Sequence, residues 1–222
     1  MPKRLAIGNG RSLAHPAARK TARKRHNRLL APNLDAMPIT ALDPHTALIV
    51  VDLQAGIASR VPPEIFKPLL ARNQALLAAF RARGLPVVLV NVAGAAPGRN
   101  EQPRPASAPP AGWDQLLPEL DRQPSDICVT KRTWGAFTGT GLAERLRALG
   151  VTQVVVTGVA TSIGVESTAR QAHELGLNVT LALDAMADLT AEGHERSVRL
   201  IFPRLGETGA AQDVIGLLQE RV

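Results

Sequence analysis

Short runs of aliphatic residues recur along the chain from about residue 46 onward. They lie at Thr46–Asp52, Pro86–Val92, Ile127–Thr130, Gln153–Thr157 and Asn178–Leu183. The runs are rich in Val, Ile and Leu and do not alternate strictly with polar residues, which is typical of strands buried on both faces of a parallel sheet. We therefore predict a mainly parallel sheet of about six strands.

Segments with helical spacing lie between these runs. Pro68–Arg83 places Leu69, Leu76 and Phe80 on one face, with Pro68 suited to a first turn. Later segments repeat the pattern with Leu142, Leu146 and Leu149, and then with Val165, Ala169, Ala172 and Leu175. A further helix is expected from about Ala191 to Ile201.

Strands that alternate with helices of this length predict a doubly wound, three-layer α/β/α domain with right-handed crossovers. The Pro-, Gly- and Ala-rich stretch Ala93–Gly112 is expected to be a long loop, of the kind that often covers a functional site. No repeat and no second domain is indicated.

Composition narrows the class of protein. The 222 residues are 45% hydrophobic and 20% charged, which is ordinary for a globular protein. A single cysteine excludes an internal disulfide framework and a zinc site built on several thiolates. No apolar run approaches the ~20 residues of a membrane-spanning helix, so we expect no membrane partner and a cytoplasmic location.

The net charge of +7 is concentrated at one end of the chain. Residues 1–36 hold nine basic side chains and one acid, Asp35, which leaves 17 basic and 18 acidic residues elsewhere. We interpret this segment as an unstructured extension, with Met37 as an alternative start of a domain at 37–222. Polyanion binding and organelle targeting are the alternatives, and no apolar stretch supports a secretory signal.

Chemistry-bearing residues follow three of the predicted strands. Asp52 ends the first, Lys131 ends the third, and the turn Gly158–Gly164 leads from the fourth into a helix. Because ligands bind at the carboxyl ends of the strands in such sheets, we expect these groups to converge there. A carboxylate beside an ammonium is suited to proton transfer, and the turn's N–H groups to binding an anion.

Three motifs in register resemble the isochorismatase-like hydrolases, a family that includes amidases of small C–N bonds. They are VVDLQAGI, VTKRTWGAFTGTGL and TGVATSIGVESTARQAHELG, and the resemblance runs from about Ala47 to the C-terminus. The family's Asp–Lys–Cys triad maps to Asp52, Lys131 and, at the position of the cysteine, Gly164. The resemblance also implies a cis peptide bond between Val159 and Ala160.

Glycine at the position of the cysteine is shared with true isochorismatases, in which the reaction needs no nucleophile. There the aspartic acid protonates a vinyl ether and water adds to the resulting cation. The resemblance thus implies that Asp52 is the acid or base, with Lys131 as its electrostatic partner. We expect the substrate to be bound by residues of the same edge: Gln54, Trp134, Phe137, Val159, Ala160, Thr161 and Ser162.

Other side chains that could replace the cysteine as nucleophile are disfavoured by their positions in the sequence. Cys128 lies three residues before Lys131, on the opposite strand face, and is expected to be a buried, inert side chain. Ser162 and Thr161 lie close to the right place but need a base, and we expect neither His173 nor His194 to reach the turn.

The remaining expectations concern ligands and partners. Trp134 and Phe137 either stack on a flat substrate or pack under the loop. Relatives that bind zinc do so beyond the second strand, where this chain has Ala93, Gly94, Ala95 and Ala96, so no metal or other cofactor is expected. The resemblance implies a homo-oligomer, and nucleic acid is expected as a partner only through residues 1–36.

The sequence as a whole favours a hydrolase acting on a small polar or carboxylated metabolite. The alternative is a family member that has lost its activity together with the cysteine and serves as a binding or assembly protein. Retention of both Asp52 and Lys131 favours the enzyme.

Overall fold

The computed structural model describes residues 39–101 and 108–220. The predictions for residues 1–36, and those for 102–107 within the long loop, lie outside the described residues. The rest of the stretch Ala93–Gly112 contains neither helix nor strand, as expected.

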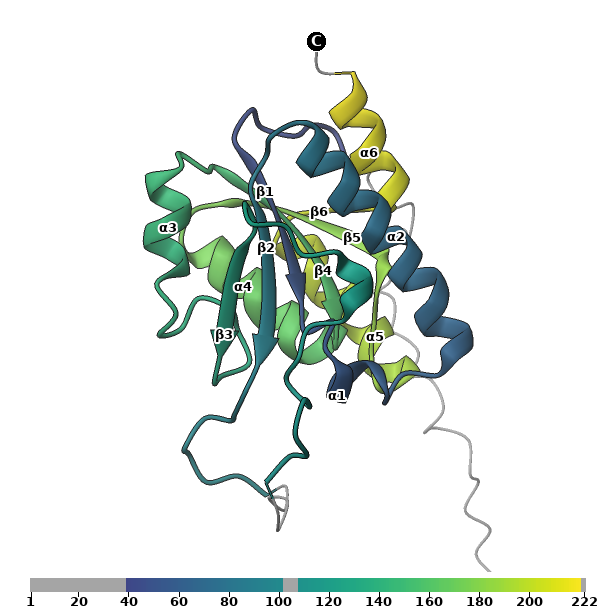
Figure 1. Ribbon diagram of the computed structural model, residues 1–222. Helices are drawn as coiled ribbons and strands as arrows, with labels where there is room; N and C mark the ends of the chain where they lie inside the picture. Colours follow the sequence, from purple (N-terminus) through teal and green to yellow (C-terminus); the bar gives the residue numbers. More distant parts are fainter. Residues whose placement is uncertain (1–38, 102–107, 221–222) are drawn as a thin grey trace, which may run out of the picture. The chain divides into compact units, whose positions relative to one another are not determined.

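All five predicted strands form, and a short sixth strand joins them in one sheet (Figure 1). The strands are β1 (Thr46–Val51), β2 (Val87–Val92), β3 (Ile127–Lys131), β4 (Gln153–Val159), β5 (Asn178–Ala187) and β6 (Glu207–Gly209). Their order is β3-β2-β1-β4-β5-β6, and every neighbouring pair is parallel. The fold is therefore a single-domain α/β fold of the doubly wound type, as predicted.

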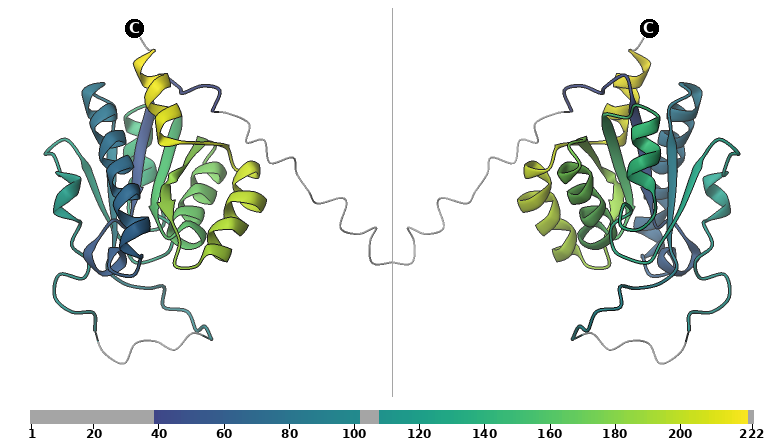
Figure 2. Two further views of the ribbon diagram at one scale, coloured as in Figure 1. Left: turned by 90° about the vertical axis from the view of Figure 1, so that its right-hand side faces the viewer. Right: turned by 90° about the vertical axis from the view of Figure 1, so that its left-hand side faces the viewer.

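Helices cover both faces of the sheet. They are α1 (Ala55–Ala58), α2 (Pro63–Ala82), α3 (Leu142–Ala148), α4 (Glu166–Glu174), α5 (Ala191–Arg196) and α6 (Ala211–Gln219), with short 3-10 or π turns η2 (Pro118–Leu120), η3 (Thr161–Val165), η4 (Ser197–Ile201) and η5 (Phe202–Arg204). Figure 2 shows α2 and α6 against one face and α3 and α4 against the other. None of the helices described is both long and apolar enough to cross a membrane.

Two hydrophobic cores result, one on each face of the sheet. Leu48 and Val50 of β1 point to the side of α2 and α6, whereas Ile49 and Val51 point to the side of α3 and α4. The aliphatic runs fail to alternate with polar residues because both faces of β1 are buried.

The predicted start of α2 is wrong by five residues. The helix begins at Pro63, which takes the first-turn position expected for Pro68. Pro68 lies on the exposed side of the second turn. There it removes one backbone hydrogen bond to the first turn without entering the core, and the helix continues through it.

The strand order places the switch point of the fold between β1 and β4. The crossovers from β1 and from β4 run in opposite directions, so the ends of these strands open a crevice at the carboxyl edge of the sheet. Figure 1 shows the arrowheads of β1, β2 and β3 at that same edge, which lies at the bottom of the view. The candidate site lies here.

Candidate active site

Asp52 follows directly on β1, in the left-handed region of backbone space with φ +54°. Non-glycine residues rarely adopt this conformation, which is enriched at functional sites. The Asp52 N–H donates to the Val90 carbonyl at 2.8 Å, so the chain is still tied to β2 where it turns. The turn leaves Asp52 only 5% exposed.

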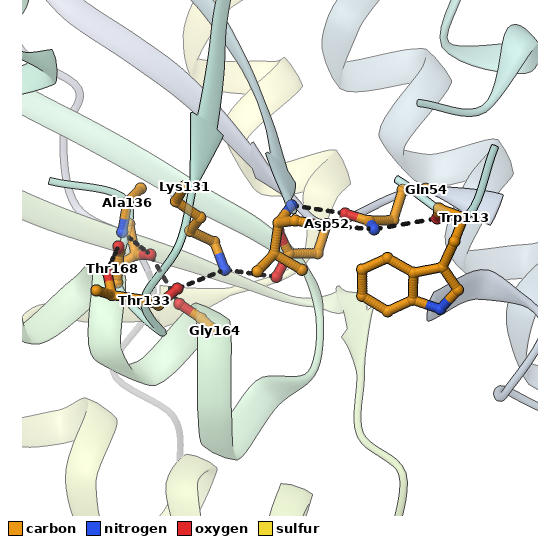
Figure 3. Close-up of polar contacts among 10 residues, drawn as sticks. Asp52, Gln54, Trp113, Lys131, Thr133, Ala136, Gly164 and Thr168 are labelled. Carbon is orange, nitrogen blue, oxygen red and sulfur yellow. Dashed lines mark hydrogen bonds and ion pairs between the residues drawn. The ribbon is translucent and has the colours of Figure 1, made fainter. Parts of the chain in front are cut away.

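Lys131 reaches Asp52 across β2 from the end of β3 (Figure 3). Its Nζ donates to Asp52 Oδ2 at 2.7 Å and to the Thr133 carbonyl at 3.3 Å. The Lys131 side chain is 2% exposed, so this is a buried ion pair. The two residues predicted to form the catalytic pair are thus brought together.

The Asp52 carboxyl group is poorly solvated. Its Oδ1 is the one buried side-chain polar atom among the described residues that has no hydrogen-bond partner. Burial raises the pKa of Asp52 to about 6 from 3.8, and Lys131 opposes this rise both by its charge and by its hydrogen bond. A carboxyl group with such a pKa exchanges its proton near neutral pH.

Gly164 faces this pair from the turn after β4. A Cβ built on Gly164 would lie 3.1 Å from Asp52 Oδ2 and 3.0 Å from Val51 Cγ1. The position at which the resemblance places the cysteine therefore points at the Asp52 carboxylate, with little room to spare. Gly158 opens the same turn with φ +114°, and a Cβ there would meet the Val51 carbonyl at 2.0 Å, so only glycine fits.

The turn between these glycines is held by the residue that follows β5 and by α5. The bond Val159–Ala160 is cis, and η3 continues from Thr161. The Ser162 N–H donates to Asp188 at 2.5 Å, and Thr161 Oγ1 lies 2.9 Å from Nδ1 of His194.

The expectation that no histidine reaches the turn is wrong. β5 runs ten residues, to Ala187, which still pairs with Val159 at the end of β4, so α5 begins close to the turn after β4. This length of β5 places His194 of α5 beside Thr161. Burial lowers the pKa of His194 and so favours its neutral form, against the opposing charges of Asp188 and Glu195.

Gln54, predicted to bind substrate, is buried and bonded to backbone groups. Its Oε1 accepts from the Val92 N–H at 2.7 Å, and its Nε2 donates to the carbonyls of Val92 and Trp113 at 3.0 and 3.2 Å. Gln54 thereby ties the loop before β3 to the end of β2. Its amide group stabilises the backbone next to the site.

Trp113 is a residue of the site that the sequence analysis missed. In the view of Figure 3 its indole ring points toward Asp52, and its carbonyl accepts a hydrogen bond from Gln54. The available signal was the short apolar pattern of Trp113, Leu116 and Leu117 after a Pro-rich stretch, which forms an isolated antiparallel bridge between Leu116 and Gln54.

The two aromatic residues after Lys131 have different surroundings. Phe137 packs against the core on the side of α3 and α4, and its N–H donates to Gln171 of α4 at 3.0 Å. Trp134 is 65% exposed at the carboxyl edge. Of the two alternatives, packing and stacking on a substrate, Phe137 shows packing. The exposed Trp134 ring remains accessible to a ligand.

Cys128 is exposed, and the prediction that it is buried is wrong. β3 pairs only with β2 at the edge of the sheet, and its residues alternate between a buried and an exposed face. Cys128 lies on the face opposite Lys131, outside the core beneath α2 and α6. No three His, Cys, Asp or Glu side chains within the described ranges cluster as metal ligands would.

Comparison with known proteins gives one consistent result. Residues 46–213 match the isochorismatase domain. The chain is 40% identical over 180 residues to the uncharacterized isochorismatase family protein YecD of Escherichia coli O157:H7, covering 78% of this chain and 96% of that protein. It is 33% identical over 168 residues to the ureidoacrylate amidohydrolase RutB of Stutzerimonas stutzeri, covering 62% and 68%.

Among solved structures, an isochorismatase family protein from Burkholderia thailandensis superimposes with a TM-score of 0.76. It shares 39% identity with this chain, and the match covers 82% of this chain and 98% of that one.

Proposed function

Because the chain belongs to the isochorismatase family, whose members are hydrolases, we propose that it hydrolyses a small polar or carboxylated metabolite with Asp52 as the acid or base. One observation carries the proposal. The buried pair of Asp52 and Lys131 lies at the switch point of the sheet, with one carboxylate oxygen unpartnered and Gly164 facing it. Groups held in this way are suited to moving a proton to or from a bound substrate.

As an acid on a vinyl ether, protonated Asp52 gives its proton to the terminal carbon of the double bond. Water attacks the oxygen-stabilised cation that forms and gives one proton to the Asp52 carboxylate, which leaves a hemiketal. As the C–O bond of the hemiketal breaks, its hydroxyl proton passes to the leaving alcohol oxygen, and Asp52 is protonated as at the start. Lys131, 2.7 Å away, stabilises the carboxylate in the interval between these steps. No nucleophile from the protein is needed, in keeping with glycine at position 164.

As a base on an amide or ureido bond, ionised Asp52 takes a proton from the attacking water, and the same proton passes to the leaving nitrogen as the C–N bond breaks. The name of the RutB relative, an amidohydrolase, supports this second route. Both routes use the same carboxyl group in opposite protonation states. They differ in the pH at which the enzyme is active.

Turnover is the test of the proposal. The full chain and its Asp52→Asn variant are assayed against isochorismate and a panel of small amides and ureido acids. We expect hydrolysis of one class by the native chain, and its loss in a variant that keeps the native circular dichroism spectrum. An unimpaired variant, or a folded chain that turns over no member of the panel, contradicts the proposal and favours a binding or assembly role.

The homo-oligomer, which the resemblance implies, and the cytoplasmic location stay predictions. Light scattering on the full chain checks the first, and a mass of 23.6 kDa, that of one chain, would contradict it.

A further inference from the structure

Trp113 is fixed to the segment that follows Asp52 by a set of backbone hydrogen bonds. The Gly56 N–H donates to the Trp113 carbonyl at 2.9 Å, and Gln54 Nε2 donates to the same oxygen at 3.2 Å. Two further bonds join the neighbouring residues, from Ala55 N–H to the Gln115 carbonyl and from Leu117 N–H to the Leu53 carbonyl. Residues 113–117 therefore run as a short antiparallel partner of residues 53–56.

The indole lies against the backbone of α1 because residue 56 is glycine. A Cβ built on Gly56 would lie 2.0 Å from Cδ1 and 2.1 Å from Nε1 of Trp113, so any larger residue would displace the ring. Figure 3 shows the six-membered ring turned toward Asp52 and the ring nitrogen turned away from it. The ring thus presents hydrocarbon, and no hydrogen-bond donor, to the carboxyl group.

Lys131 and Trp113 lie on opposite sides of Asp52 in this view. Among the charged groups described, Lys131 alone bonds to Asp52 and alone contributes a Coulombic shift of its pKa. Arg132, the next residue along, directs its side chain against Gly94. The Oδ1 of Asp52 has no hydrogen-bond partner within the described residues.

We propose that Trp113 is a positioning residue of the active site: held by Gln54 and Gly56, its ring forms the apolar wall that keeps water from the Asp52 carboxyl group. The inference rests on, and deepens, the proposed function, in which Asp52 moves the proton. A carboxyl group against an apolar wall loses solvation of its ionised form, which is the direction of the shift found for Asp52. The acidity of Asp52 is thereby set by a loop outside the three family motifs.

The first experiment uses the fact that the chain has two tryptophans. Trp134→Phe leaves Trp113 as the only indole, and its fluorescence is followed from pH 4.5 to 8. We expect a titration with a midpoint of about 6, which disappears when Asp52→Asn is added. Emission that does not change with pH, or that titrates equally with asparagine at position 52, overturns the proposal.

The second experiment asks whether the wall acts on Asp52. The midpoint of the Asp52 carboxyl group is followed by carbon-13 NMR in the full chain, in Trp113→Leu, and in Trp134→Leu as the matched control. We expect Trp113→Leu to move the midpoint down toward 3.8, whereas Trp134→Leu leaves it in place. An unmoved midpoint in folded Trp113→Leu contradicts the proposal.

Trp113→Phe, which keeps an aromatic ring on Gly56, is the conservative variant. It should retain most of the shift that Trp113→Leu loses, and loss equal to that of leucine contradicts an apolar wall. None of these readouts requires turnover. A chain that shows the titration but hydrolyses no substrate supports the role of Trp113 and contradicts the proposed hydrolase function. A chain that hydrolyses a substrate but shows no titration supports the hydrolase function and contradicts the role of Trp113.

Discussion

An ion pair lies at each end of strand β3, and the two pairs differ in how completely the carboxylate is bonded. At the amino end, both oxygens of the Asp126 carboxylate accept hydrogen bonds from the Arg81 guanidinium, at 3.3 and 2.6 Å. One of them also accepts the Gln123 N–H at 2.8 Å. At the carboxyl end, one oxygen of Asp52 accepts a hydrogen bond from Lys131 Nζ, and the other oxygen has no hydrogen-bond partner among the described residues.

The difference separates a pair that stabilises the fold from one that is suited to chemistry. The planar Arg81 side chain bonds Asp126 through two nitrogens, which fixes its geometry. Asp52 has a strained backbone, a free oxygen and a raised pKa. Leaving a buried oxygen unbonded costs stability, and such costs are concentrated at functional sites.

The largest effect is expected from removing the charge at the carboxyl end. Asp52→Asn keeps the size of the side chain and cannot exchange a proton, so turnover should fall about 10²–10⁴-fold. Steady-state assays with the substrate found in the panel measure this. A fall of less than tenfold would place the acid or base elsewhere.

The matched change at the amino end should affect stability alone. Asp126→Asn weakens the bonds to Arg81, which is 19% exposed, and should lower the free energy of unfolding by about 1.5–3 kcal/mol. Urea denaturation measures the loss, and turnover per folded molecule should stay native. Loss of turnover in the folded variant would mean that the two ends of β3 are not separate in function.

Adding a methyl group at position 164 should reduce turnover more than it reduces the stability of the fold. Gly164→Ala places a Cβ 3.1 Å from Asp52 Oδ2, tighter than ordinary contact, and we expect turnover to fall roughly tenfold, about 1.4 kcal/mol in activation free energy. Gly216→Ala in α6 is the control, because a Cβ there meets nothing within 4 Å. It should stabilise the chain by about 0.5–1 kcal/mol without changing turnover.

The smallest effect is expected at Cys128. This side chain is exposed on β3 between the two ion pairs, so iodoacetamide should modify it in the folded chain, as mass spectrometry would show. Turnover should change by less than about twofold, since Cys128 lies on the face opposite Lys131. Inactivation by alkylation, prevented in Cys128→Ser, would restore a thiol mechanism.

The sequence predicts those parts of the site that follow from strand ends. Asp52 and Lys131 end aliphatic runs, and the carboxyl ends of parallel strands share one edge, so their meeting follows from the pattern. The glycines of the turn after β4 were found for the same reason.

The remaining parts depend on contacts that no local pattern encodes. Gln54 and Trp113 meet through a side-chain bond to a backbone carbonyl 59 residues away. His194 reaches Thr161 because β5 is longer than its aliphatic run, and Cys128 is exposed because β3 is an edge strand. Strand register, strand length and position in the sheet are determined by tertiary packing, which a single sequence does not display.

The central claim is that Asp52, at the carboxyl end of the sheet, exchanges a proton near neutral pH. The pH dependence of kcat/KM tests this claim most directly. With a pKa of about 6, half of Asp52 is protonated at pH 6, compared with about one molecule in 160 at the ordinary value of 3.8. If Asp52 is the acid, kcat/KM falls about tenfold per pH unit above 6, and if it is the base, kcat/KM falls in the same way below 6.

The account predicts one such limb with a midpoint of about 6, absent from any residual activity of Asp52→Asn. A profile that is flat from pH 4.5 to 8, or a limb that survives in Asp52→Asn, would contradict it.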